Sequence, residues 1–514
     1  MGIPYYFYKL SQKYNNIVSN KKPENTDIYC IDFNGIIHNV AQELIYQKDI
    51  VNIEDKIIEG VWNKILYYID TYKAKKYIIC ADGVAPAAKM IQQRKRRYLS
   101  IHRNKIDDKY VTNKPQWDTN AITPGTHFMN KLNVFIAKQI RYSTHSIELI
   151  YSGSDETGEG EHKIFRKLKV ENEYSNIIIN GLDADLIILS LISHKDNIYL
   201  MRETKDKDTC KTIFNYLNID NLKKAILCEV KENWNLEISY DSYDDIDIVE
   251  TYCTMTSILG NDFIPHLLTI ELKTDGIDKL VSATKKSIEQ NGLLVNKGKI
   301  NYDTLKYIFK FLSVSEDKDM HYICEKYINK KIIREAKLPS DCYALKHKDC
   351  LTYYIYDNPI NWHKEYYKQI FDNNITLDST VVFNACDNYI KGIYWVYSYY
   401  RGYNIDCEWY YPYNFPPILK DLTNHSIACE EPIIEKNNNF VSPNIQLLIV
   451  LPKESSHLLK PNYKKYMEDI YQGLFHMYPV KYKIQTFLKT HLWECCPILP
   501  LININYIKRV IESN

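Results

Sequence analysis

Acidic side chains recur where the predicted strands of this chain end. Apolar runs that finish in aspartate occupy residues 27–32, 76–82, 147–155 and 175–185. Asp32, Asp82, Asp183 and Asp185 stand at three of these ends. A single aspartate in such a place is ordinary, because it caps the following helix. Strands of an open parallel sheet present their carboxyl ends at one edge, so the repetition predicts a cluster of carboxylates there.

Two glutamates belong to the same group of candidates. Glu159 and Glu161 lie in "TGEGEHKI" (157–164), between Gly158 and Gly160. Side chains two residues apart on a regular helix point to nearly opposite sides. We therefore expect a loop or a bent first turn, with the glycines permitting the bend. The N-terminus of the following helix is expected to help keep both carboxylates ionised.

Asp262, in "LGNDFIPH", completes a set of seven acids that one site could collect: Asp32, Asp82, Glu159, Glu161, Asp183, Asp185 and Asp262. Carboxylates crowded without cations repel one another, so several pKa values should rise. Divalent ions with oxygen ligands relieve this repulsion, which indicates two Mg²⁺ ions, with Mn²⁺ as a substitute. Two ions about 4 Å apart support in-line attack on a phosphodiester. The alternative, unrelated helix caps, leaves the repetition unexplained.

A basic helix follows the second acidic strand end. In "AKMIQQRKRRY" (88–98), four side chains share one helical face: Lys89, Gln93, Arg96 and Arg97. Arg94 and Lys95 are predicted to point into solvent. Guanidinium groups beside a metal site suit a terminal phosphate. The alternative is a solvated basic face.

Composition narrows the class of protein. The 514 residues suggest two or three domains, and 65 Lys+Arg against 64 Asp+Glu give no net charge that would indicate an anionic partner. The 13 cysteines form no C-x-x-C pair, so we expect free thiols in a reducing compartment and no structural zinc. No apolar run reaches the length of a membrane span, and "IQLLIVL" (445–451) suits a buried strand. We expect a cytoplasmic protein that has no membrane partner.

The order of predicted elements indicates an α/β fold. The apolar runs alternate with helical patterns at 54–74 and 126–144, as in a parallel sheet. Residues 1–272 are therefore predicted to form the first domain. Residues 273–340 are expected to be a helical linker or insertion, and 341–514 a helical second region.

Several long motifs carry a family resemblance. They are "MGIPYYFYKLSQKY" at the start, "IDFNGIIH" (31–38), "DGVAPAAKMIQQRKRRY" (82–98), "NAITPGTHFM" (120–129), "GEGEHKI" (158–164), "GLDADLIILSL" (181–191), "GNDFIPH" (260–266), "YWVYSYYRGYNIDCEWYYPYNFPP" (394–417) and "QLLIVLPKESSHLL" (446–459). The chain resembles the XRN family of 5′→3′ exoribonucleases, as a short, cytoplasmic-type member.

The resemblance implies a PIN/flap-nuclease-like core, with a mostly parallel sheet flanked by helices and a helix-rich second region that completes the active site. Such an enzyme removes nucleoside 5′-monophosphates from single-stranded RNA that carries a 5′-monophosphate. The resemblance assigns the seven acids to the metals and Lys89, Gln93, Arg96 and Arg97 to a 5′-phosphate pocket. His38 would stack on one base. Trp409, with Trp395 as second candidate, would stack on another, while the other aromatic residues of 394–413 are expected in the core.

The sequence also departs from the family pattern and leaves rivals open. Glu156, Thr157 and His127 replace other residues usual in the family, and Ala121 replaces a frequent cysteine, which bears on loop geometry and rate. One rival is a flap-endonuclease-like 5′ DNA nuclease. Another is a catalytically weak RNA-binding relative. No motif supports a decapping role.

Overall fold

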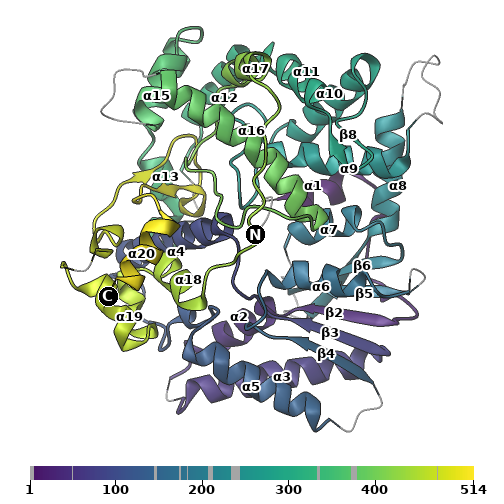
Figure 1. Ribbon diagram of the computed structural model, residues 1–514, viewed down its shortest axis with the longest axis vertical. Coiled ribbons are helices and arrows are strands. Elements are labelled where there is room, and N and C mark those ends of the chain that lie inside the picture. Colours follow the sequence, from purple (N-terminus) through teal and green to yellow (C-terminus); the bar gives the residue numbers. More distant parts are fainter. Residues whose placement is uncertain are drawn as a thin grey trace.

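The computed structural model describes residues 5–48, 50–143, 147–172, 175–181, 183–205, 212–232, 243–332, 336–371, 379–471 and 473–513. It contains a seven-stranded sheet, seen in the lower right of Figure 1, in the order β1-β7-β6-β5-β2-β3-β4. The strands are β1 (Val18–Ser19), β2 (Ile28–Asp32), β3 (Lys76–Cys80), β4 (Glu148–Ser152), β5 (Ile177–Asn180), β6 (Ile198–Lys205) and β7 (Thr212–Asn218). Strands β2 to β6 run parallel, while β7 and β1 add an antiparallel edge. The four predicted strands are confirmed, and so is the α/β fold class.

Both faces of the sheet are covered by helices. In β2, Tyr29 and Ile31 face one core, whereas Ile28 and Cys30 face the other, as the two-residue period of a strand requires. The first face carries α2 (Phe33–Leu44), α3 (Ile53–Tyr72) and α5 (His127–Arg141). The opposite face carries α1 (Tyr6–Lys13), α6 (Gly160–Leu168), α7 (Asp185–Ile192), α8 (Ile219–Lys231) and α9 (Asp245–Thr256). In Figure 1, α3 and α5 lie below β2, β3 and β4, and α6 and α7 lie above these three strands.

A large helical region stands on this second face. It contains α10 (Gly276–Gln290), α11 (Tyr302–Ser313), α12 (Glu316–Ile328), α13 (Tyr343–Lys346), α14 (Cys350–Asp357), α15 (His363–Ile370), α16 (Ser379–Arg401) and α17 (Leu419–Ala428), with the short hairpin β8 (Val295–Asn296) and β9 (Lys299–Ile300). Buried side chains of α10 and α11, such as Leu280 and Ile308, belong to the same core as Tyr389 of α16. The helical character predicted for 273–340 is therefore present, and these helices pack into the body of the protein. The domain boundaries themselves stay predictions.

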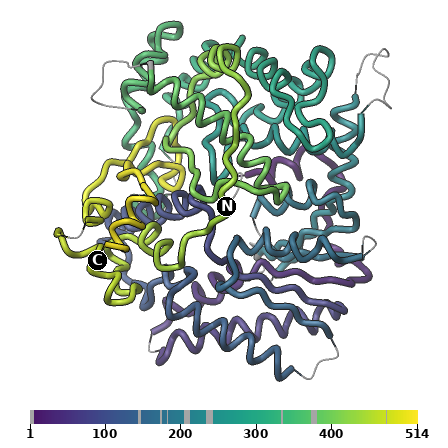
Figure 2. Tube along the Cα trace, in the orientation of Figure 1, coloured from purple at the N-terminus to yellow at the C-terminus, as the bar shows by residue number. Residues whose placement is uncertain are grey.

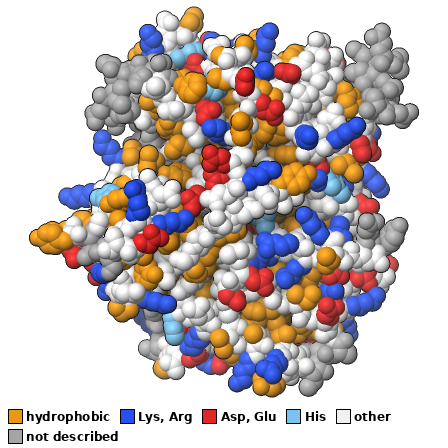
Figure 3. Space-filling model, in the orientation of Figure 1, with side chains coloured by type: hydrophobic (Ala, Val, Ile, Leu, Met, Phe, Trp, Pro, Cys, Tyr) orange, Lys and Arg blue, Asp and Glu red, His pale blue; other side chains and the backbone are white. Residues whose placement is uncertain are grey.

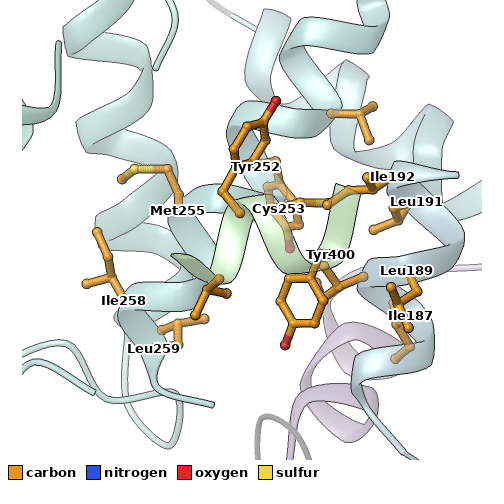
Figure 4. Close-up of a cluster of buried hydrophobic side chains, with 14 of the residues drawn as sticks. Ile187, Leu189, Leu191, Ile192, Tyr252, Cys253, Met255, Ile258, Leu259 and Tyr400 are labelled. Carbon is orange, nitrogen blue, oxygen red and sulfur yellow. The ribbon is translucent and has the colours of Figure 1, made fainter. Parts of the chain in front are cut away.

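The end of α16 is anchored in this core. Figure 4 shows Tyr400 among apolar side chains of α7, such as Ile187 and Leu189, and of the segment that includes α9, such as Tyr252 and Ile258. The helix thereby reaches from the second region onto the sheet domain.

The remaining helices surround the basic helix α4 (Ala87–Asp107). They are α18 (Pro443–Val450), α19 (Pro461–Glu468) and α20 (Ile504–Glu512), and the small hairpin β10 (Ile484–Gln485) and β11 (Cys496–Pro497) completes the group. Figure 2 shows that this C-terminal part of the chain wraps around α4, which is far from it in sequence. The strand predicted at 445–451 is wrong, because Ser442 caps and Pro443 opens a helix there. A short apolar run alone does not distinguish a strand from a buried helix.

The prediction that Arg94 of α4 points into solvent is also wrong. Its side chain is 1% exposed rather than solvated. It donates hydrogen bonds to the carbonyl oxygens of Ile449, at 2.9 Å, and Met477. Burial lowers the pKa of this guanidinium. The residue therefore fastens α4 to the C-terminal segment, an interaction that only the tertiary structure reveals.

The surface is mixed in charge. Figure 3 shows positive and negative side chains interspersed over one face, with apolar residues between them. Among the described residues, no helix is both long and apolar enough to cross a membrane. The twelve cysteines that the structure describes are free thiols.

Candidate active site

The carboxyl ends of β2 and β3 bring two of the predicted acids together. Asp82 accepts hydrogen bonds from the Gly160 amide (2.7 Å) and from the Asn34 side chain (2.9 Å). A Cβ atom at position 160 would lie 3.3 Å from carboxylate oxygens of both Asp32 and Asp82, and 2.7 Å from the Cys80 carbonyl. Glycine is therefore required where α6 approaches the strand ends. Asn34 was not among the predicted site residues, although it lies in the "IDFNGIIH" motif.

Glu159 and Glu161 reach the same edge from the start of α6. Glu159 is the residue before the helix, with extended backbone, and Glu161 lies in its first turn. Gly158 adopts a φ of 100°, in the left-handed region that favours glycine. The predicted bent turn is confirmed. Both side chains are almost fully buried, at 3% and 5% exposed.

Lys89 lies inside the acid cluster. Its ammonium group is 2.5 Å from Glu159 and 2.8 Å from Asp262. Burial alone would lower the pKa of Lys89, but the surrounding carboxylates, Asp262 first, hold it well above its ordinary value. Burial likewise favours the neutral form of Asp262, yet Lys89 outweighs it and lowers the pKa of that acid. Lys89 thus links the basic helix to two of the acids as a fixed positive charge.

Four of the other acids have raised pKa values when no cation is bound. Burial, with neighbouring carboxylates, raises the pKa of Asp32 to about 8 and that of Asp185 to about 8. The pKa values of Glu159 and Glu161 are raised as well, mainly by burial. The predicted rise is therefore confirmed for these four acids, and for Glu159 and Glu161 burial outweighs the help that the α6 N-terminus was expected to give their ionised forms. Desolvation of a buried carboxylate outweighs the partial charge of a helix end.

The second region supplies two tyrosines to this cluster. The Tyr399 hydroxyl donates to Glu159 Oε1 at 2.7 Å, and the Tyr400 hydroxyl donates to Asp185 Oδ1 at 3.0 Å. Both come from α16, more than 200 residues away in sequence. We expected the aromatic residues of 394–413 to serve mainly as core, and no local signal distinguishes these two from their neighbours.

The donor set fits a divalent cation. Glu161 Oε1 and Asp185 Oδ2 are buried without a hydrogen-bond partner among the described residues. Ligand atoms of Glu159, Glu161 and His162 lie within 4.8 Å of one another. Burial lowers the pKa of His162 to about 3, so the imidazole ring is neutral. This ring packs against the ring of Tyr399, with 3.9 Å between the two ring centroids. His162, in "GEGEHKI", was also not predicted. Buried, unpaired carboxylate oxygens suit a hard divalent cation.

The basic face of α4 lies beyond Lys89. Arg97 donates to the Thr123 hydroxyl at 2.6 Å, whereas its second terminal nitrogen, Nη1, is buried without a partner among the described residues. Gln93 Oε1 is likewise buried without a hydrogen-bond partner among the described residues. A side-chain amide can be turned so that either its oxygen or its nitrogen occupies this position. Arg96 is exposed. Burial, with Arg96 beside it, lowers the pKa of Arg97 to about 9, so the guanidinium stays charged at neutral pH.

The stacking candidates differ in their surroundings. Burial, with Arg96 and Arg97 nearby, lowers the pKa of His38 to about 4, which leaves a neutral ring beside the basic face. Trp409 is half-buried, and its ring centroid lies 5.4 Å from that of Trp395. Trp395 is 1% exposed and donates to the Asp406 carbonyl at 2.8 Å, so it is a core residue and not a free stacking surface. Trp409 keeps its assignment as a prediction.

The fold and site together define a class: α/β proteins that gather carboxylates at the ends of parallel strands, where they suit divalent metal ions. Family models place the chain more closely. The model described as "XRN 5'-3' exonuclease N-terminus" matches residues 1–204, and the "Xrn1 helical domain" matches residues 242–343 and 359–512. The chain belongs to the XRN 5′-3′ exonuclease family.

Individual relatives agree with this assignment. The chain is 26% identical to the 5′-3′ exoribonuclease 1 of Homo sapiens, over all of this chain and 34% of the relative. It is 26% identical to that of Saccharomyces cerevisiae, over all of this chain and 43% of the relative. The 5′-3′ exoribonuclease 2 of Gallus gallus is 24% identical over all of this chain and 70% of the relative. The chain thus spans a third to a half of the length of the first two.

Among solved structures, the catalytic core of Rad2 in complex with DNA substrate matches 62% of this chain and 75% of its own, at 13% identity and a TM-score of 0.33. The fold class rests on the sheet order and the helical layers described above.

Proposed function

We propose that this chain is a metal-dependent 5′→3′ exoribonuclease that degrades single-stranded RNA with a 5′-monophosphate, processively, to nucleoside 5′-monophosphates. The single observation that carries the proposal is the meeting of two groups of residues along α4. Lys89, at its first turn, contacts the acids Glu159 and Asp262. Arg97, about two turns further on, offers an unpaired buried donor. A metal site thereby adjoins an anion site.

The seven acids would hold the metal: Asp32, Asp82, Glu159, Glu161, Asp183, Asp185 and Asp262. Two Mg²⁺ ions bound there would supply Lewis-acid activation for phosphodiester hydrolysis. The residues of the chain then have separate tasks. Asn34 and the Gly160 amide orient Asp82, and Tyr399 and Tyr400 orient Glu159 and Asp185. The covering helix α16 also excludes bulk water from these carboxylates.

The 5′ end of the RNA would be read by α4. Gln93, Arg96 and Arg97, with Lys89 at the metal side, present donors to a terminal phosphate, which carries more charge than an internal one. The neutral ring of His38 lies beside these arginines and suits stacking, which tolerates any base. Trp409 is proposed for the other end of the base stack. The proposal places the protein in the cytoplasm, where its free thiols would remain reduced.

The rival functions are a 5′ DNA nuclease of flap-endonuclease type and a catalytically weak RNA-binding relative. The first shares the strand-end acids. The unpaired buried donor at Arg97, one turn along α4 from Gln93, favours a free 5′-phosphate as substrate, and the completeness of the acid set favours catalysis.

A time course on one RNA with a 5′-monophosphate, a 5′-hydroxyl or a cap, with and without Mg²⁺, tests the proposal. A DNA flap of the same sequence serves as the comparison. We expect mononucleotide release only from the 5′-monophosphorylated RNA and only with the metal. Preferred cleavage of the flap, or RNA binding without turnover, would support one of the two rivals instead.

Two variants assign the roles. Asp185→Ala should abolish degradation while RNA binding persists, and unchanged activity would remove this acid from the metal site. Arg97→Ala should erase the preference for a 5′-phosphate over a 5′-hydroxyl. An unaltered ratio would show that the phosphate pocket lies elsewhere.

A further inference from the structure

A cavity of about 500 Å³ lies on the flank of α4 next to the basic face described above. Its walls are α4, the segment around 259–273 and the C-terminal segment 488–496. Arg96 and Asp262 belong both to this lining and to the candidate active site. The cavity therefore adjoins that site, and its volume is in the range of small-ligand sites, about 300–1,000 Å³.

The lining carries an excess of positive charge. Five cations, Lys95, Arg96, Arg103, Lys273 and Lys489, face three carboxylates, Asp262, Glu271 and Glu494. Asp262 is already bound to Lys89, and Glu494 is bound to Lys273.

Four of the cations have no such partner. Lys95, Arg96, Arg103 and Lys489 form no ion pair with any carboxylate in the part of the chain that the structure describes, and Lys95 and Lys489 are half-buried. Burial lowers the pKa of Lys95. A desolvated ammonium group without a counter-charge is costly, so this wall favours an anionic ligand.

A neutral donor belongs to the wall formed by the segment around 259–273. Asn261 Oδ1 accepts the amides of Phe263 (2.9 Å) and Ile264 (3.0 Å), which fixes the orientation of its side-chain amide. Its Nδ2 is buried and has no partner among the described residues.

Two exposed aromatic rings contribute to the lining as well. Tyr5 and Trp493 are 43% and 48% exposed, with ring centroids 6.2 Å apart. The ammonium group of Lys273 lies 5.2 Å from the Tyr5 centroid and 6.0 Å from that of Trp493. Exposed rings beside cations provide a stacking surface for a nucleobase.

We infer that this cavity binds a nucleoside 5′-monophosphate, with its phosphate on Lys95, Arg96 and Arg103 and its base on Tyr5 and Trp493. The further idea that the product of RNA degradation leaves through this cavity rests on the proposed function. The binding of a nucleotide in the cavity does not depend on that function. Arg96 contributes to both the 5′-phosphate face and the cavity. The phosphate of a released nucleotide can therefore pass along α4 without losing this contact.

The test measures binding of adenosine 5′-monophosphate by calorimetry in EDTA, which prevents turnover. The measurements are made in the Arg97→Ala variant, because this substitution weakens nucleotide binding at the proposed 5′-phosphate pocket. Adding Lys95→Gln should lower the remaining affinity roughly tenfold, as expected for one charge-assisted hydrogen bond. Adenosine, which lacks the phosphate, should show no such dependence. Lys105→Gln is the matched control, because Lys105 lies on the same helix but pairs with Glu454 outside the cavity.

Degradation assays with the single variant Lys95→Gln separate the outcomes. The KM for 5′-monophosphorylated RNA should stay within about twofold of wild type, while the inhibition constant of adenosine 5′-monophosphate rises roughly tenfold. Unchanged nucleotide affinity in Lys95→Gln would overturn the inference, and a tenfold rise in KM with unchanged nucleotide affinity would assign the cavity to the RNA strand. If the wild type degrades no RNA, the proposed function fails, and the calorimetry alone then decides the nucleotide site. Melting temperatures establish that each variant is folded.

Discussion

The hydrogen bond from Tyr399 to Glu159 gives the sharpest test of how the second region completes the site. Tyr399→Phe deletes only the hydroxyl, which donates to Glu159 Oε1 at 2.7 Å. The ring, which packs against His162, is retained. Burial raises the pKa of Glu159, and the Tyr399 hydrogen bond opposes this rise. The variant should therefore hold Glu159 less firmly in the ionised form that binds a cation.

The size of the effect follows from the type of bond. A hydrogen bond to a charged group contributes about 1.5–3 kcal/mol. Each 1.36 kcal/mol corresponds to a factor of ten, so about a tenfold to hundredfold loss of metal affinity is expected. This range agrees with losses of about 10–100-fold seen when partners of metal ligands are removed.

Two measurements check the prediction. The first is the Mg²⁺ concentration at half-maximal degradation of 5′-monophosphorylated RNA, and the second is Mn²⁺ binding by calorimetry without substrate. Tyr397→Phe is the matched control, because it lies on the same helix and its hydroxyl donates to Glu250 at 2.7 Å, outside the acid cluster. If Tyr399→Phe binds both metals as tightly as Tyr397→Phe does, the tyrosine does not position Glu159 and the reasoning is refuted.

Three further predictions concern the same site and its support. Because burial raises the pKa of Asp32 and Asp185 to about 8, above the unfolded value of about 3.9, the metal-free folded protein binds extra protons between these values. The contribution of these two acids to the stability of the metal-free protein should thus be lost as pH rises toward 8. Mg²⁺ should therefore raise the melting temperature more at pH 8.5 than at pH 5.5. Equal increases in melting temperature at the two pH values would contradict the raised pKa values. Gly160→Ala places a Cβ atom 2.7 Å from the Cys80 carbonyl, so it should lower the free energy of unfolding by about 1–3 kcal/mol and weaken Mg²⁺ activation. Gly35→Ala, where a Cβ meets nothing within 4 Å, should do neither. Arg94→Met should lower the free energy of unfolding measured in urea by about 1–3 kcal/mol, because the Ile449 and Met477 carbonyls lose their donors; wild-type stability would exclude Arg94 as the anchor of α4.

The sequence by itself determined the sheet domain and the members of the acid cluster. Strands β2 to β5 could be predicted because each is a short apolar run between helical patterns, and such runs belong to parallel strands buried on both faces. The bent turn at Glu159 and Glu161 could be predicted because Gly158 and Gly160 flank it and the two-residue spacing excludes a regular helix. These are local properties, and the shared edge of a parallel sheet then brings the acids together.

The tertiary structure decided what these residues touch. Arg94 and Arg97 lie three positions apart on one basic helix, yet only Arg94 meets backbone carbonyls of the C-terminal segment, which no helical pattern reveals. In the sequence, Tyr399 and Tyr400 cannot be distinguished from their aromatic neighbours. Only the packing of α16 against the acid cluster gives them hydrogen bonds to Glu159 and Asp185. The protonation of Asp32 and Asp185 likewise depends on how much water the covering helices exclude. Desolvation and long-range hydrogen bonding arise from packing between segments distant in sequence, and for that reason only the folded chain could show them.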